Sequence, residues 1–322
     1  MATGGATEAS DHGELLQVEQ VGRPNTGLGQ ALLPKQRAHY AANLDSQSAR
    51  HGLAKRILLI AAKMGSSRPK NQVFGIRLST LTKNEIVDRL LEDRCVGMGV
   101  RLLATANVDH VVTLRKDHAF RTSYERAWLV TADGALVYAY ARLLGIPVSE
   151  RVTGADLINS LAEKLSPERH RLFFVTCTQR AANLVEAKFV AKGFQPDQIA
   201  CAVPPRGFER SPLESKALTE LVNRHRPTHL IIGISALRGQ TWLSRCDENL
   251  GDVYALSTGA AIEYYLGLKR RAPQQLRRFG LEWLWRLLME PRRLARRYLL
   301  ESWSFVPAVV ADLVTRGERG RL

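Results

Sequence analysis

Residues 128–144 read WLVTADGALVYAYARLL, a short apolar run followed by a longer segment with helical spacing. The run at 128–131 predicts a buried strand, and residues 134–144 predict a helix. The turn between them carries Asp133 and Gly134. A strand that leads through a polar turn into a helix is the unit from which helix-covered parallel sheets are built.

The same unit recurs on both sides of this stretch. Further strands are predicted at 101–106, 171–176, 199–203, 229–234 and 252–257, and further helices at 108–116, 154–165, 179–192, 212–225 and 240–249. A strand and turn from residue 73 and an amphipathic helix from residue 83 precede the series. This alternation indicates an α/β fold, in which helices cover both faces of a parallel sheet.

The composition divides the chain into three parts. Residues 1–70 are rich in small and polar residues, and we expect them to be mostly disordered, with one short helix near 54–64. Residues 71–265 hold the strand–helix series. Residues 266–322 contain 13 Lys or Arg and 5 Asp or Glu, so they carry +8 of the net charge of +15. We expect this last part to be a separate basic, amphipathic appendage.

Charge and cysteine content limit the partners, metal sites and location that can be expected of this protein. A net charge of +15 favours anionic partners such as nucleic acid, anionic lipid or phosphorylated substrates. The four cysteines form no CxxC pair, which argues against a zinc site or a disulfide framework. No signal peptide opens the chain, and no apolar run reaches the roughly 20 residues that cross a bilayer. We therefore expect a cytoplasmic protein.

Polar side chains stand at the ends of two predicted strands and in the segment that precedes the helix predicted at 154–165. Thr105 and Asn107 end one strand, Asp133 ends the next, and Arg151 lies in ERVTGADL (150–157). Ligands bind at the carboxyl ends of strands in open α/β sheets, and an arginine beside a helix N-terminus suits a phosphate. Each residue also has a structural interpretation: helix caps, an ordinary turn aspartate and a surface arginine.

Four ordered blocks carry a resemblance. They are TANVDHVVTLRKD (105–117), TADGALVYAYARLLGIPVSERVTGADL (131–157), KRRAP (269–273) and GLEWLWRLLMEPRRLARRYL (280–299). Their order and spacing resemble the WecG/TagA/CpsF glycosyltransferase family over roughly residues 72–300. The resemblance implies a Rossmann-like α/β core. It also implies an inverting, metal-independent enzyme without a cofactor, which moves a hexose from a UDP-sugar to a polyprenyl-diphosphate-linked saccharide in exopolysaccharide or cell-envelope synthesis.

The resemblance also assigns roles to residues. Asp133 becomes the general base, and Thr105 lies beside it at the catalytic centre. The residues expected to bind substrate are Asn107, Gly134, Arg151, Gly233, Arg238, Gln240 and Gly259. The chemistry is consistent, because a carboxylate must take the acceptor's hydroxyl proton and positive charge must stabilise the leaving diphosphate. No D-x-D motif occurs in the sequence, so no metal is expected.

Two stretches depart from the family pattern. VTCTQRAAN (175–183) lacks the glycine-rich loop that is usual there. GISALRGQTW (233–242) keeps Gly233 and Trp242, but Gly239 stands at the usual glutamine position and Gln240 follows it. We therefore consider both UDP-glucose and UDP-N-acetylmannosamine as donors, and the departures favour UDP-glucose.

The C-terminal segment is expected to meet an anionic membrane surface. The apolar positions at 276–288 predict one helix, Pro291 begins another, and residues 301–322 add a third. Arginines beside apolar faces are typical of interfacial helices. We expect Trp283 and Trp285 at the interface and Arg286, Arg293 and Arg297 on the acceptor's diphosphate. The enzyme would be peripheral on the cytoplasmic face of the bacterial inner membrane. The alternative is a helix pair packed on the core with a solvated basic face.

Three rival functions are considered. A nucleic-acid-binding protein fits the charge, but no nucleic-acid module is recognisable, so no nucleic-acid partner is expected. A dinucleotide-dependent oxidoreductase fits the alternation, but G-x-G-x-x-G does not follow the first strand. A non-catalytic assembly subunit of a polysaccharide-synthesis complex fits the two departures, and it remains the alternative to the enzyme.

Overall fold

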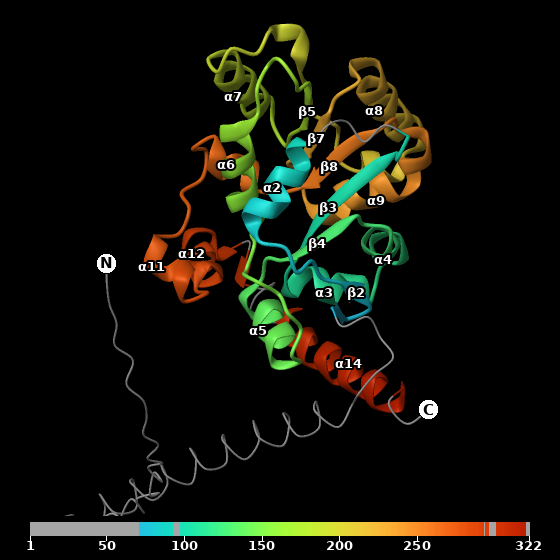
Figure 1. The fold of residues 1–322 in the computed structure, drawn as a ribbon, viewed down its shortest axis with the longest axis vertical. Helices are drawn as coiled ribbons and strands as arrows, with labels where there is room; N and C mark the ends of the chain where they lie inside the picture. Colours follow the sequence, from blue (N-terminus) through green and yellow to red (C-terminus); the bar gives the residue numbers. More distant parts are fainter. Residues whose placement is uncertain (1–70, 93–96, 293, 296–300, 320–322) are drawn as a thin grey trace, which may run out of the picture. The chain divides into compact units, whose positions relative to one another are not determined.

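The computed structural model describes residues 71–92, 97–292, 294–295 and 301–319. Figure 1 shows these residues as a coloured ribbon. The extension predicted for residues 1–70, with its helix near 54–64, lies outside the described residues. Two of the arginines predicted to bind the acceptor, Arg293 and Arg297, also lie outside them.

Six parallel strands form the central sheet in the order β4-β3-β8-β7-β5-β6. They are β3 (Val100–Ala106), β4 (Leu129–Ala132), β5 (Leu172–Val175), β6 (Ile199–Ala202), β7 (His229–Ile232) and β8 (Val253–Ser257). All six correspond to predicted strands, so the predicted α/β fold with a parallel sheet is confirmed. A two-stranded antiparallel hairpin, β1 (Gln72–Val73) and β2 (Ile76–Arg77), precedes the sheet.

The register of the sheet decides which turns lie side by side. Residue Ala106 of β3 pairs with Ala132 of β4, and Leu103 of β3 pairs with Leu256 of β8. The residues that follow β3 and β4 are Asn107 and Asp133, so the two turns leave the sheet next to each other. This edge is the carboxyl end of the sheet, where open α/β proteins bind their ligands.

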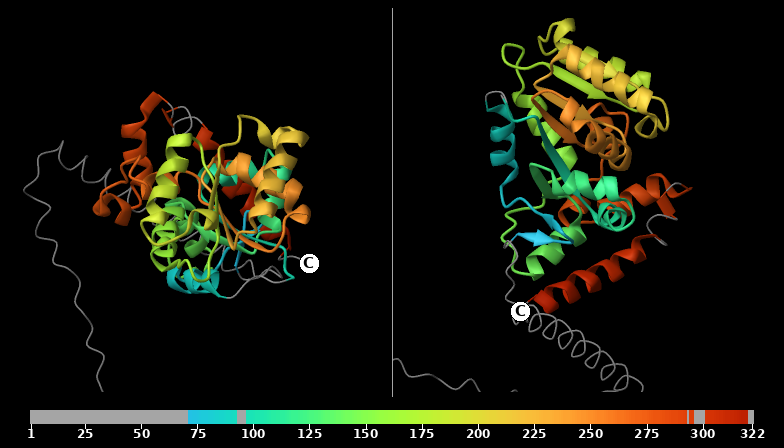
Figure 2. Two further views of the ribbon diagram at one scale, coloured as in Figure 1. Left: turned by 90° about the horizontal axis from the view of Figure 1, so that it is seen from above. Right: turned by 90° about the vertical axis from the view of Figure 1, so that its right-hand side faces the viewer.

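Helices cover both faces of the sheet (Figure 2). One hydrophobic cluster joins the sheet to α2 (Lys83–Leu91), α6 (Gly154–Lys164), α7 (Gln179–Val190) and α10 (Ala261–Tyr265). A second cluster joins the sheet to α3 (Val108–Leu114), α4 (His118–Glu125), α5 (Ala135–Leu143), α8 (Pro212–His225) and α9 (Ala236–Cys246). Short 3-10 turns occupy Pro196–Gln198, Phe208–Arg210, Asp247–Asn249 and Glu301–Ser304. Helices packed on both faces therefore fix the position of the sheet and of its carboxyl edge.

Two helices differ from the sequence-based expectation. The helix α4 was not predicted, although Asp117 caps it by accepting a hydrogen bond from the backbone N–H of Phe120 at 2.8 Å. The helix predicted at 240–249 begins at Ala236 instead. Gly239 therefore lies inside α9, where a Cβ would approach Ile232 Cγ2 to 2.5 Å. The glycine allows α9 to pack closely on β7, a purpose that its place in the motif did not reveal.

The single helix predicted from the apolar positions at 276–288 is two helices, so that expectation is wrong. α11 (Gln274–Arg278) and α12 (Glu282–Met289) are separated at Gly280, which has a φ of +71°. A Cβ at residue 280 would lie 2.7 Å from Ala135 Cβ, at the start of α5. Glycine is required there by both the left-handed backbone and the close approach. The break brings the start of α12 next to the turn that carries Asp133.

The last helix, α14 (Phe305–Arg319), packs on the core. The ring of Phe305 packs against that of Phe74 in a tilted arrangement, with a centroid distance of 5.5 Å. The buried Asp312 carboxylate accepts hydrogen bonds from the backbone N–H of Phe74 at 2.9 Å and from the hydroxyl of Tyr140 at 3.0 Å. The final helix therefore ties the β1–β2 hairpin to α5, in addition to any role at a membrane.

The outer face of α14 is apolar. Val306, Val310 and Val314 recur every four residues, and each side chain is more than half exposed. None of the helices in the described part of the chain combines the length and the apolar character that crossing a bilayer requires.

Candidate active site

The turns after β3 and β4 touch each other. The backbone N–H groups of Asp133 and Gly134 both donate to the carbonyl oxygen of Ala106 at 3.0 Å. A Cβ at residue 134 would lie 2.9 Å from Asn107 Cα, so only glycine fits between the two turns. The role of Gly134 is thus to allow the turn after β4 to contact the turn after β3. The structure brings together Asn107, Asp133 and Gly134, three of the residues predicted from the sequence.

Asn107 caps helix α3. Its Oδ1 accepts a hydrogen bond from the backbone N–H of His110 at 3.1 Å, and its Nδ2 lies 3.4 Å from His110 Nε2. Because His110 Nδ1 lies 2.6 Å from the carbonyl oxygen of Thr105, Nδ1 donates and Nε2 is left to accept. Thr105 itself lies inside β3, and its side chain is buried. Sequence reasoning missed His110, although it stands in the quoted stretch TANVDH.

The Asp133 side chain is half-buried at the carboxyl edge of the sheet. Within the described residues, no group donates a hydrogen bond to its carboxylate. The pKa of Asp133 is raised to about 6, chiefly by burial; Arg286 and Arg151 oppose this rise, while Glu282 and Asp156 contribute to it. A carboxylate that titrates near neutral pH can accept a proton readily and is suited to general base catalysis.

Arg151 links the Asp133 turn to the C-terminal segment. Its Nη1 donates to the carbonyl oxygen of Asp133 at 3.0 Å, and its Nη2 donates to the carbonyl oxygen of Arg277 at 3.1 Å. These contacts use the backbone of both partners, so they hold α11 beside the site whatever side chains the partners carry.

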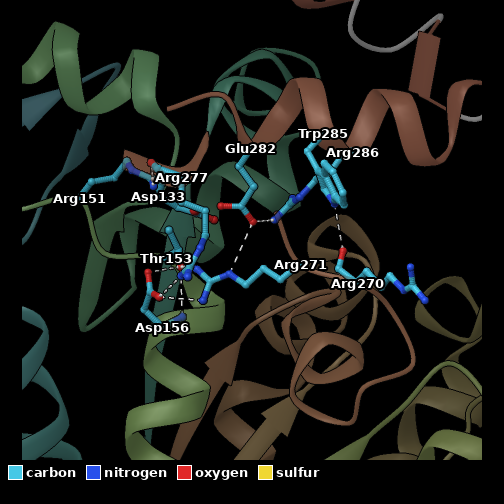
Figure 3. A network of polar contacts seen from close by, with 10 residues as sticks. All are labelled: Asp133, Arg151, Thr153, Asp156, Arg270, Arg271, Arg277, Glu282, Trp285 and Arg286. Atoms are coloured by element: carbon cyan, nitrogen blue, oxygen red, sulfur yellow. Dashed lines mark hydrogen bonds and ion pairs between the residues drawn. The ribbon is translucent and has the colours of Figure 1, made fainter. Parts of the chain in front are cut away.

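Arginines from the C-terminal segment surround this turn (Figure 3). Arg271 pairs with Asp156 at 2.8 Å and donates to Thr153, the cap of α6, at 3.0 Å. Arg277 lies 3.8 Å from the same Asp156 oxygen. In the described part of the molecule, the Nε atoms of Arg271 and Arg277 are buried without a hydrogen-bond partner. Buried donors of this kind are uncommon, and an anionic ligand would satisfy them.

A buried glutamate belongs to this arginine cluster. Glu282 Oε1 accepts a hydrogen bond from Arg286 Nη2 at 2.8 Å and lies 3.8 Å from Arg271 Nε. The guanidinium of Arg286 lies over the ring of Tyr264, 5.4 Å from its centroid. Arg286, predicted to bind the acceptor, is therefore fixed at the site by an acid and an aromatic ring.

Two other predicted ligands are held by protein groups. Gln240 is fully buried; its Oε1 accepts from Ser123 at 2.9 Å and its Nε2 donates to Ser257 at 3.0 Å. Arg238 Nε pairs with Glu209 at 3.2 Å, and its Nη2 donates to the carbonyl oxygen of Pro205. Both side chains link elements of the fold in this structure. The spacing of a motif does not reveal which way its residues face.

The two remaining predicted glycines lie at the same edge of the sheet. A Cβ at Gly233 would lie 2.4 Å from Ile262 Cγ2, so this glycine allows α10 to pack against the end of β7. Gly259 has a φ of +53° and donates its N–H to the carbonyl oxygen of Ile232 at 3.2 Å.

The two predicted interface tryptophans differ in setting. Trp283 is 47% exposed on α12. The indole N–H of Trp285 donates to the carbonyl oxygen of Arg270 at 3.2 Å, so Trp285 helps to hold the segment before α11. Among the described residues, no three His, Cys, Asp or Glu side chains are arranged to hold a metal ion.

Comparison with known proteins identifies a family whose model spans the described region and relatives that match part of it. The family model "Glycosyl transferase WecG/TagA/CpsF family" matches residues 71–319. An N-acetylglucosaminyldiphosphoundecaprenol N-acetyl-beta-D-mannosaminyltransferase of Staphylococcus aureus strain MW2 is 23% identical over 194 residues, which cover 60% of this chain and 74% of the relative. Proteins of the same name from strains NCTC 8325 and MRSA252 are 22% and 21% identical over the same shares.

Proposed function

We propose a reaction for this chain from one premise: it belongs to the WecG/TagA/CpsF family, whose model matches residues 71–319, and is therefore a glycosyltransferase. The reaction is the transfer of a hexose from a UDP-sugar to a saccharide linked to polyprenyl diphosphate, with inversion at the anomeric carbon. The product would serve exopolysaccharide or cell-envelope polysaccharide synthesis.

One observation carries this proposal: the Asp133 carboxylate lies at the carboxyl edge of the sheet, with a pKa of about 6, among arginines. In the transfer, the acceptor hydroxyl oxygen attacks the anomeric carbon of the donor. Its proton passes to Asp133, and the bond between the anomeric carbon and the UDP oxygen breaks. UDP leaves with the bonding electron pair.

The surrounding cations suit the two diphosphates of this reaction. Arg151, Arg271, Arg277 and Arg286 lie around the Asp133 turn, and the donor and the acceptor each carry a diphosphate. Arginine donates in a planar fork that matches phosphate oxygens, and preorganised positive charge stabilises a leaving diphosphate. The chain can therefore supply this stabilisation from its own residues, which supports a metal-independent mechanism.

The relatives support the acceptor class. Their names describe transfer to N-acetylglucosaminyldiphosphoundecaprenol, a lipid-linked sugar. An acceptor anchored in lipid requires an enzyme that docks on the membrane surface, and the exposed apolar side chains of α12 and α14 beside arginines fit that requirement. We place the enzyme on the cytoplasmic face of the bacterial inner membrane, as a peripheral protein.

A UDP-release assay over several UDP-sugars, with lipid-diphosphate-linked acceptors, tests the proposal. We expect Asp133→Asn to lower the transfer rate by at least about 100-fold while the fold is kept, because the variant cannot accept the proton. Asp88→Asn is the matched control, since Asp88 is an exposed aspartate paired with Lys164. The proposed base is wrong if Asp133→Asn retains the wild-type rate.

The donor panel separates the remaining alternatives. The departures from the family pattern favour UDP-glucose as the donor. Turnover with UDP-glucose would support this preference, whereas turnover with UDP-N-acetylmannosamine alone would overturn it. Absence of turnover with every donor would favour the non-catalytic assembly subunit over the enzyme.

A further inference from the structure

Glu282 is a buried acid in the midst of the arginine cluster. It is the first residue of α12, and only 7% of its surface is exposed. Its position follows from the break at Gly280, where the chain approaches Ala135, two residues after Asp133. The carboxylate also lies at a helix N-terminus, where negative charge is favoured.

Docking alone does not explain this residue. A buried ion pair contributes little net stability compared with apolar side chains of the same volume. The face of α12 that turns toward the core could therefore have been apolar. Instead, Glu282 makes contacts with Arg286 and Arg271, which come from different parts of the C-terminal segment.

The site must satisfy two opposing electrostatic demands. Binding a diphosphate requires several cations, but nearby cations stabilise the Asp133 carboxylate and make it a weaker base. The charged groups that act on Asp133 are Arg286 and Glu282 from α12, Arg151 from the segment before α6, and Asp156 from α6. Of the two acids that act on Asp133, Glu282 is the one that comes from the C-terminal segment itself.

We propose that Glu282 is a positioning residue, which holds Arg271 and Arg286 beside Asp133 and offsets their charge. One site can then bind a diphosphate and still contain an effective base. This inference rests on the proposed function for its catalytic meaning. The charge balance at Asp133 is a property of the protein without substrate.

Two variants separate the charge of Glu282 from its positioning effect. Glu282→Gln keeps the shape and the hydrogen bond to Arg286 but removes the negative charge. The acid limb of the pH profile of kcat/KM should move to lower pH by about half a unit to one unit, because Asp133 loses a neighbour that raises its pKa. Glu282→Ala also removes the contact, so the KM for the lipid-linked acceptor should rise severalfold as well.

Two further variants control this experiment. Glu290→Gln removes another acid of the same helix region, which pairs with Lys269 at 3.5 Å, and should leave the pH profile unchanged. Arg286→Met removes a cation that lowers the pKa of Asp133, so its acid limb should move to higher pH. Thermal unfolding of each variant identifies any loss of fold.

Titration of the Asp133 carboxyl by carbon-13 NMR, without substrate, provides a readout that does not depend on the reaction. A lower apparent pKa in Glu282→Gln supports the inference even if no donor is turned over, in which case only the proposed reaction fails. An unchanged Asp133 titration and an unchanged pH profile in folded Glu282→Gln would overturn the inference and leave the proposed reaction standing.

Discussion

The helices α12 and α14 come from the same basic C-terminal segment, but they meet the rest of the protein in different ways. The inner side of α12 is ionic, with Glu282 and Arg286 next to the Asp133 turn. The inner side of α14 is mostly apolar, with Phe305 in the core and Asp312 bound to two other elements. Two helices of one basic segment therefore meet the core differently: α14 contributes to stability, and in the proposed function α12 contributes to the chemistry.

Deletion of residues 301–322 is the strongest test of this comparison. Removing α14 exposes Phe74 and Tyr140 and leaves their hydrogen-bonding groups without Asp312. We expect the free energy of unfolding to fall by about 5 kcal/mol, as for loss of a buried phenylalanine and its neighbours. Urea unfolding measures this change. An unchanged free energy would show that α14 is a dispensable appendage.

Asp312→Ala tests the same contact with one side chain. The buried carboxylate accepts from Phe74, Tyr140 and Arg316, and its removal leaves three donors unsatisfied. The free energy of unfolding should fall by about 3 kcal/mol, while the transfer rate of folded protein changes little. Val310→Ser, on the exposed face, should stay within about 0.5 kcal/mol. A large fall in the transfer rate of Asp312→Ala protein that remains folded would instead show that α14 contributes to the active site.

Asp133→Asn should have the opposite effect on stability. Because burial raises the pKa of Asp133 to about 6, the folded state binds the proton more tightly than the unfolded state. This contribution is present below the ordinary pKa of an aspartate and is lost as pH rises through about 6. Above that pH, Asp133→Asn should therefore be more stable than wild type, by about 1–2 kcal/mol after allowance for solvent screening.

The same titration predicts the pH dependence of the transfer. Only the carboxylate form of Asp133 accepts a proton, so kcat/KM should rise as pH increases through about 6. Rate measurements on both sides of this pH, together with unfolding curves, test the two effects on one protein. A flat profile would assign the base to another residue.

The smallest expected effect concerns the membrane. Trp283 is 47% exposed, and its replacement by alanine should weaken binding to anionic vesicles by about 1 kcal/mol. Trp285→Ala should weaken it less, because that indole is bound to the carbonyl oxygen of Arg270. Val306→Ser makes the equivalent change on α14. An equal loss of vesicle binding in Val306→Ser would show that both helices contact lipid, so that α12 and α14 would not differ in this respect.

Much of the sheet follows from local pattern. Each strand is a short apolar run before a turn, and the register of β3 and β4 brings the predicted Asn107 and Asp133 together. The sequence could not show the direction of side chains within α9, where Gln240 and Arg238 contact protein groups. Direction depends on which neighbours the helix meets, and those are distant in sequence.

The C-terminal segment was the least predictable part, because its contacts too are with residues distant in sequence. Helical spacing continues across Gly280, so only the contact of that residue with Ala135 reveals the break. Asp312 was the available signal for α14, because a single acid within the apolar stretch FVPAVVADLV needs a partner if it is buried. The partners, Phe74 and Tyr140, could not be identified without the fold.

The bond between Phe74 and Asp312 spans 238 positions of the chain. During synthesis, the hairpin leaves the ribosome long before α14 exists, so it must wait without its cover until α14 emerges. The sheet can assemble on the ribosome in the meantime, but closure over Phe74 and Tyr140 requires α14 to have emerged. A prematurely terminated product would leave that patch open, which marks it for chaperones and proteases.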